Sequence, residues 1–162
     1  MALTIFMNHH FSSKKITKKI AVIGIGNTLR SDDGIGAHIC TLLDEMNLVG
    51  VSTIIVQQLP IEIMEELTHY DLVILVDASL SGEEASLIPL FFDKTKALAA
   101  SHHLNAQMFR ALSEKMFGIK IPLLLCSVKG ENFEFGESLS TYAYANADKA
   151  MELILDWITN KL

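Results

Sequence analysis

The sequence predicts an α/β fold: a three-layer α/β/α sandwich around a mainly parallel, twisted sheet of about five strands. Short apolar runs rich in β-branched residues alternate along the chain with segments whose apolar residues recur at helical spacing. The runs are continuous rather than alternating, which is typical of strands buried on both faces. Strands that alternate with helices are joined by right-handed crossovers, so the strands lie parallel and helices cover both faces.

The expected strands are short and bounded by turn residues. Four of them are internal apolar runs: 20–25 (IAVIGI), 51–56 (VSTIIV), 72–78 (LVILVDA) and 121–128 (IPLLLCSV). A fifth, residues 86–92, contains Pro89. Proline cannot donate to the ladder of hydrogen bonds, so this segment is expected at an edge of the sheet.

The expected helices lie between these strands and after the last of them. They cover residues 34–46, 60–67, 104–117 and 139–162. Ser31 or Asp32 can cap the first of these helices. Pro60 is tolerated in the first turn of the second helix, and Gly118 ends the third.

Length and composition favour one globular domain. The chain has 162 residues, enough for one sizeable core. We expect a flexible N-terminal extension over residues 1–19, without the apolar stretch of a secretory signal, and a single domain over 20–162. The chain carries 13 basic and 19 acidic residues, a net charge of −6 that argues against a nucleic-acid binder.

Hydropathy and cysteine usage indicate the compartment. Mean hydropathy is +0.33, yet the longest uninterrupted apolar run, IPLLLC at 121–126, is far shorter than the ~20 residues of a membrane span. Cys40 and Cys126 lie far apart among apolar neighbours, without a CxxC motif. They are interpreted as buried thiols in a reducing compartment, and we expect a cytoplasmic protein without a membrane partner.

The stretch IGIGNTLRSDDGIG (23–36) begins like a dinucleotide-binding loop. However, Leu29 stands where the third glycine of that fingerprint belongs, and no acid for a ribose follows the second strand at 56–58. Asp32 and Asp33 would repel a pyrophosphate, and the phosphate-binding GxxxxGK[ST] motif is absent. We therefore expect no nucleotide, and a nucleotide-binding domain remains a competing hypothesis.

Polar residues gather instead where strands end. Asp33 follows the first strand, Asp77 directly follows VILV, and His102 and His103 stand at the predicted start of a helix. Each has a structural alternative: the acids can cap helices or loops, and the histidines can be surface residues. Because the carboxyl ends of parallel strands meet at one edge of a sheet, a converging site is plausible. Two carboxylates and an imidazole suit Ni²⁺, Zn²⁺ or a similar ion.

Three motifs in order resemble the hydrogenase maturation endopeptidases. They are GxGNxLxxDDGxG at 24–36, VDA at 76–78 and SHHL at 101–104, and the similarity runs from about residue 20 to the C-terminus. The segments 57–59 and 129–140 resemble a subgroup that serves NAD-linked or related bidirectional [NiFe] hydrogenases.

The resemblance implies an endopeptidase, aspartic-type by family classification. It would remove the C-terminal extension of a [NiFe] hydrogenase large-subunit precursor after nickel insertion. By the same resemblance, Asp33, Asp77 and His102 bind the nickel of the substrate, for which zinc or cadmium can substitute in vitro. His103 is the alternative in register, and Asp33 and Asp77 are the catalytic candidates. A monomer is expected.

Supporting roles are expected in the loop after the first strand. Asn27 would tie the loop by side-chain hydrogen bonds, while Gly24, Gly26 and Gly34 permit a tight turn and close approach. Asp32 would be a helix cap or a partner of the metal ligands. The sequence leaves open whether a carboxylate or the metal activates water. A non-enzymatic nickel-sensing chaperone with the same metal site is the alternative function.

Overall fold

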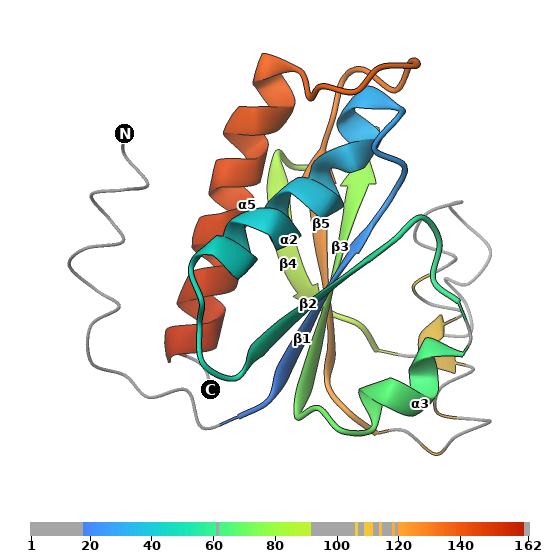
Figure 1. Cartoon of the computed structure of the whole chain (residues 1–162), viewed down its shortest axis with the longest axis vertical. Coiled ribbons are helices and arrows are strands. Elements are labelled where there is room, and N and C mark those ends of the chain that lie inside the picture. The colour runs from blue at the N-terminus through green and yellow to red at the C-terminus, as the bar shows by residue number, and fades with distance from the viewer. Residues whose placement is uncertain are drawn as a thin grey trace.

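The computed structural model describes residues 18–60, 62–91, 106, 109–111, 114, 118 and 120–160. These residues form one five-stranded sheet with strand order β2-β1-β3-β5-β4, flanked by helices (Figure 1). The strands are β1 (Ile20–Ile25), β2 (Val51–Val56), β3 (Leu72–Ser79), β4 (Ala85–Pro89) and β5 (Leu123–Lys129). The predicted fold class is confirmed.

The sheet is mainly parallel. β1 pairs in parallel with β2 and β3, and β3 pairs in parallel with β5. β4 pairs antiparallel with β5 at the edge of the sheet, where Pro89 lies opposite Leu124. The edge position expected from this proline is therefore confirmed.

The helices α2 (Ile35–Glu45), α3 (Ile63–Leu67) and α5 (Thr141–Asn160) each begin one to three residues later than expected. A 3-10 helix, η1 (Ser31–Gly34), precedes α2. Gly34 occupies the N-cap of α2 without a side-chain cap bond, so the prediction that Ser31 or Asp32 caps this helix is wrong. α3 does not begin at Pro60, whose carbonyl accepts a hydrogen bond from the N–H of Ile63 in the turn before the helix.

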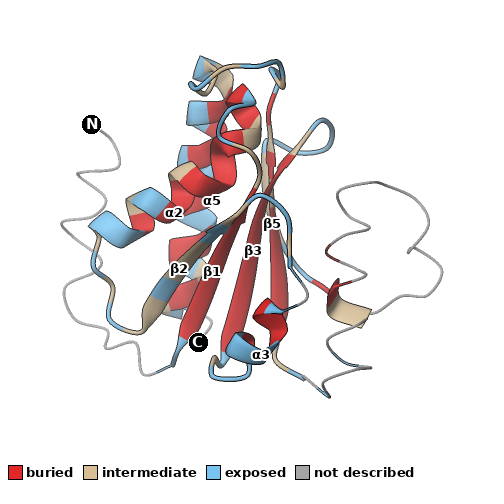
Figure 2. Cartoon of the chain, turned by 45° about the vertical axis from the view of Figure 1, so that its right-hand side comes forward, coloured by how far each residue is buried: buried red, intermediate tan, exposed pale blue. Residues whose placement is uncertain are grey.

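Two hydrophobic cores lie on opposite faces of the sheet, so the three-layer arrangement is confirmed. One core packs α2 and α5 against one set of strand side chains, among them Val22, Ile74 and Cys126. The other core packs α3, together with Ala106 and Phe109, against the opposite set. Figure 2 shows the central strands buried along their length between these layers.

Several predictions fall wholly or partly outside the described residues. Most of the expected N-terminal extension does so, as does much of the helix expected over 104–117. The described residues of that helix are all helical: Ala106, Phe109, Arg110, Ala111 and Glu114. Both cysteines are free and buried, as expected. Across the described residues, no helix is both long and apolar enough to cross a bilayer.

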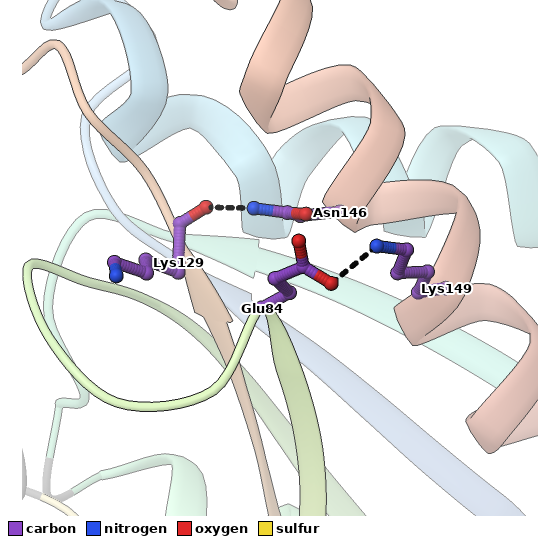
Figure 3. Close-up of polar contacts among 4 residues, drawn as sticks. All are labelled: Glu84, Lys129, Asn146 and Lys149. Atoms are coloured by element: carbon purple, nitrogen blue, oxygen red, sulfur yellow. Dashed lines mark hydrogen bonds and ion pairs between the residues drawn. The ribbon is translucent and has the colours of Figure 1, made fainter.

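The C-terminal end of β5 is held in place by α5 (Figure 3). The side-chain amide of Asn146, 1% exposed, donates a hydrogen bond to the carbonyl of Lys129 at 2.8 Å. Nearby, Lys149 of α5 forms an ion pair with Glu84. The N–H of Lys129 donates to the carbonyl of Glu84 at 3.0 Å. These contacts position the point at which the chain leaves β5 and enters the residues that border the site.

Candidate functional site

Asp33 and Asp77 line the same cavity, which has a volume of about 330 Å³. Asp77 is the sixth residue of β3 and stands in register with Ser127 of β5. Asp33 lies in η1, just after the loop that follows β1. The cavity is therefore at the carboxyl edge of the parallel strands, where sites in open α/β sheets form. Two of the side chains that the sequence singles out thus line one cavity, while their roles as metal ligands and catalytic groups stay a prediction.

Asn27 orients Asp33. The N–H of Asn27 donates to Oδ2 of Asp33 at 2.7 Å, and Oδ1 of Asn27 accepts the N–H of Leu29 at 2.9 Å. The second contact is an Asx turn, in which a side chain holds its own loop. Asp33 is thereby held in place through one oxygen. No described residue donates a hydrogen bond to its other oxygen.

Two glycines, Gly24 in β1 and Gly26 in the loop after it, let the chain pack tightly against α2 and η1. A Cβ on Gly24 would lie 2.3 Å from the carbonyl oxygen of Gly36. Gly26 has a φ of +134°, and a Cβ there would lie 1.9 Å from the carbonyl oxygen of Asp33. Gly34 differs, because its nearest neighbour would be 3.4 Å away. Close approach is thus required at Gly24 and Gly26, and much less at Gly34.

Asp32 points away from the cavity and into the protein. Its carboxylate is fully buried and accepts the N–H groups of Glu131, Asn132 and Ser140, and the hydroxyl of Ser140, at 2.7–2.9 Å. Burial by itself raises the pKa of Asp32, but the hydrogen bonds outweigh it, so the pKa lies below the usual value. The two adjacent acids therefore have different tasks: Asp33 faces the cavity and Asp32 holds the structure together.

The residues that Asp32 holds form a segment that we call the 130–140 loop, Gly130 to Ser140. It also bonds to Ser31, whose N–H donates to the carbonyl of Gly136 at 2.8 Å and whose hydroxyl donates to that of Glu134 at 3.1 Å. Phe133 of this loop lines the cavity. The sequence-based site did not include this wall.

A sequence signal for this wall exists in its glycines. A Cβ on Gly130 would lie 2.7 Å from Cβ of Asp32, and one on Gly136 would lie 2.6 Å from Oγ of Ser31. Glycines at both places allow the loop to lie directly on η1. Spacing alone could not show this, because the partners are about a hundred positions apart along the chain.

Another part of the cavity lining follows β2. Gln57, Gln58 and Leu59 line it, and Leu80 borders it from the segment after β3. The side-chain amides of the two glutamines offer donors and acceptors, while the leucines and Phe133 offer apolar surface. This mixture of polar and apolar groups suits a peptide better than a phosphate.

His102 and His103 lie outside the described residues, so the imidazole of the predicted metal triad stays a prediction. Within the described part of the chain, no group of three or more His, Cys, Asp or Glu side chains is placed to hold a metal ion. The described site thus supplies two carboxylates.

Comparison with solved structures shows a shared fold. The hydrogenase maturating endopeptidase HybD from E. coli has a TM-score of 0.71 and 20% identity, over 88% of this chain and 93% of that one. The [NiFe] hydrogenase maturation protease HycI from Thermococcus kodakarensis KOD1 has a TM-score of 0.65 and 24% identity, covering 96% and 99%.

A third structure, the hydrogenase 2 maturation peptidase from Thaumarchaeota archaeon SCGC_AB-539-E09, has a TM-score of 0.63 and 22% identity, over 86% and 97%. Neither a protein-family model nor a curated protein matches the sequence. The chain therefore has the fold of these maturation endopeptidases over nearly the whole length of each.

Proposed function

We propose that this chain is a hydrogenase maturation endopeptidase, which removes the C-terminal extension of a [NiFe] hydrogenase large-subunit precursor after nickel insertion. The observation that carries the proposal is the meeting of Asp33 and Asp77 in one cavity. Both come from motifs that resemble this family, and the fold is that of solved maturation endopeptidases.

The two carboxylates would act on the nickel that the substrate carries. Carboxylate oxygens at the rim of a sheet can enter vacant positions around a first-row metal ion. Asp33, held by Asn27 through one oxygen, presents its other oxygen without a donor among the described residues. His102, with His103 as the alternative in register, would complete the set. Precursor without nickel would then lack the anchor that places its scissile bond in the cavity.

Hydrolysis needs one water and no further co-reactant. The water gives a proton to a base while its oxygen attacks the carbonyl carbon of the scissile peptide bond. The C–N bond then breaks, and the proton passes to the leaving nitrogen, which departs as an amine. A carboxylate of the cavity is the base in this proposal. Gln57 and Gln58 can hold the peptide backbone by hydrogen bonds at the same time.

The test is to incubate the purified chain with a nickel-loaded large-subunit precursor and to measure the mass of the precursor. We expect a decrease equal to the C-terminal extension, and no decrease with nickel-free precursor. A precursor encoded beside the gene for this chain is the first choice. Precursor that binds the chain in a nickel-dependent way but keeps its full mass would overturn the peptidase proposal in favour of a chaperone.

A further inference from the structure

The cavity holds one charged group that the proposed chemistry does not use. Arg30 lines it together with Asp33 and Asp77. Among the described residues that line the cavity, Arg30 is the one with a positive charge. A surface arginine near two acids would ordinarily pair with one of them. Within the described part of the chain, however, the salt bridges involve other residues.

The guanidinium of Arg30 is already docked on one side. Its Nε and Nη2 donate to the carbonyl of Phe133 in the 130–140 loop, at 3.3 and 3.2 Å. Nη1 donates to no described group. One edge of the planar guanidinium group is thus bound to a neutral carbonyl oxygen. Its remaining N–H groups are left as donors for a second partner.

The backbone beneath Arg30 is also held in place. Ser31 has a φ of +48°, a conformation that costs free energy in a residue with a Cβ. Its hydrogen bonds to Gly136 and Glu134 compensate this cost. Because Ser31 adopts this conformation, Asp32 enters the protein while Arg30 stays at the cavity. The donors of Arg30 are therefore arranged before any ligand arrives.

We propose that Arg30 is a substrate-binding residue that recognises a carboxylate of the peptide cut at this site. This inference rests on the proposed function and names the chemistry that the cavity selects. A guanidinium fork matches a carboxylate with two parallel hydrogen bonds, a stronger contact than one with a neutral group. The carboxylate comes from an acidic side chain of the C-terminal extension or from its terminus.

The main test compares kinetics of wild type, Arg30→Gln and Arg30→Lys on nickel-loaded precursor. Loss of a charged hydrogen-bonded contact should raise KM of Arg30→Gln on the order of tenfold to a hundredfold, with a smaller change in kcat. Arg30→Lys keeps the charge but loses the paired donors of the guanidinium group, so its KM should lie between those of wild type and Arg30→Gln. Lys120→Gln is the matched control, since Lys120 is exposed and precedes the opposite, amino end of β5.

Substrate variants separate the two sources of the carboxylate. One precursor carries Asn or Gln in place of the acids of its extension, and a second ends in an amide. The variant that removes the recognised carboxylate should raise KM for wild type but not for Arg30→Gln. An unchanged KM of Arg30→Gln on the unmodified precursor would overturn the inference while leaving the proposed function intact.

A binding measurement keeps the inference testable without cleavage. The full-length chain, labelled with ¹⁵N, is titrated with N-acetylglycine, with N-acetylglutamate 1-amide and with the neutral control N-acetylglycinamide. The Nε–Hε resonance of Arg30 should shift with at least one carboxylate and not with the control. Such a shift, without cleavage of any precursor, would retain the Arg30 site and reject the proposed function. No shift with either carboxylate would reject the Arg30 site itself.

Discussion

The carboxylate of Asp32 accepts two hydrogen bonds from Ser140, one from its N–H at 2.7 Å and one from its hydroxyl at 2.8 Å. The same hydroxyl accepts the N–H of Ala143 at 3.1 Å. One buried acid therefore joins the loop after β1 to the first turn of α5. Because it also binds Glu131 and Asn132, it fixes the wall of the cavity.

Replacing this acid should cost stability. Asp32→Asn keeps the size of the side chain, but its NH₂ group must face a buried donor and the charge is lost. We expect the free energy of unfolding to fall by about 2–4 kcal/mol, measured by urea denaturation. Asp71→Asn is the control, because Asp71 is exposed and, among the described residues, accepts only the N–H of Lys19. Its effect should stay below about 1 kcal/mol, and equal effects would contradict the role given to Asp32.

The contribution of Asp32 should also depend on pH. Burial raises the pKa of Asp32, but the hydrogen bonds from Ser140, Asn132 and Glu131 lower it further, so the folded-state pKa is depressed. An acid with a depressed pKa stabilises the fold above its unfolded-state pKa, about 3.9, and this contribution is lost as pH falls through the folded-state pKa.

The difference in unfolding free energy between wild type and Asp32→Asn should therefore be constant from neutral pH to about pH 5, and shrink below about pH 4. Urea denaturation of both proteins over this range measures it. A difference that stays constant in acid would show that Asp32 titrates alike in the folded and unfolded chain.

Gly26, in the loop after β1, and Gly34, in η1, offer a matched pair of substitutions. Gly26→Ala places a Cβ 1.9 Å from the carbonyl oxygen of Asp33, at a φ of +134°, so the loop must move. We expect a loss of about 3 kcal/mol or more and a displaced Asp33. Gly34→Ala meets its nearest atom at 3.4 Å without a positive φ, and should change stability by less than about 1 kcal/mol. Thermal unfolding of both variants tests this difference in stability. Similar melting temperatures would count against the packing argument.

The sequence predicted local features well and distant contacts poorly. The bounds of β1 agree with the expected strand, since its continuous apolar run records burial on both faces. The bounds of β2 agree as well, although β2 lies at an edge of the sheet and is only partly buried. The meeting of Asp33 and Asp77 followed from strand polarity. Of the two roles expected for Asp32, a helix cap or a partner of the metal ligands, the cap is wrong, and its actual partners lie about a hundred residues away along the chain. Because of that distance, the 130–140 loop was missed as part of the site.

The contacts of Figure 3 also predict unequal costs. Asn146→Ala removes the buried donor to the carbonyl of Lys129, and should lower the free energy of unfolding by about 1–3 kcal/mol. Lys149→Ala breaks an ion pair whose side chains are about half exposed. Such pairs contribute little, so its effect should stay below about 1 kcal/mol. Urea denaturation compares the two, and a larger cost for Lys149→Ala would refute this ranking.

The carboxylates of the cavity should be needed for cleavage rather than for folding. Asp33→Asn retains an oxygen for the N–H of Asn27, so the loop can keep its shape while the charge is lost. We expect Asp33→Asn and Asp77→Asn to slow precursor cleavage by about 10²–10⁴-fold, measured as the rate of mass loss. Asp44→Asn is the control, because Asp44 binds Thr53 away from the cavity and its loss should leave the rate unchanged. Replacing a carboxylate that serves only as the base should lower kcat alone. Replacing one that binds the substrate's nickel should also raise KM. Full activity of both cavity variants would remove these acids from the mechanism.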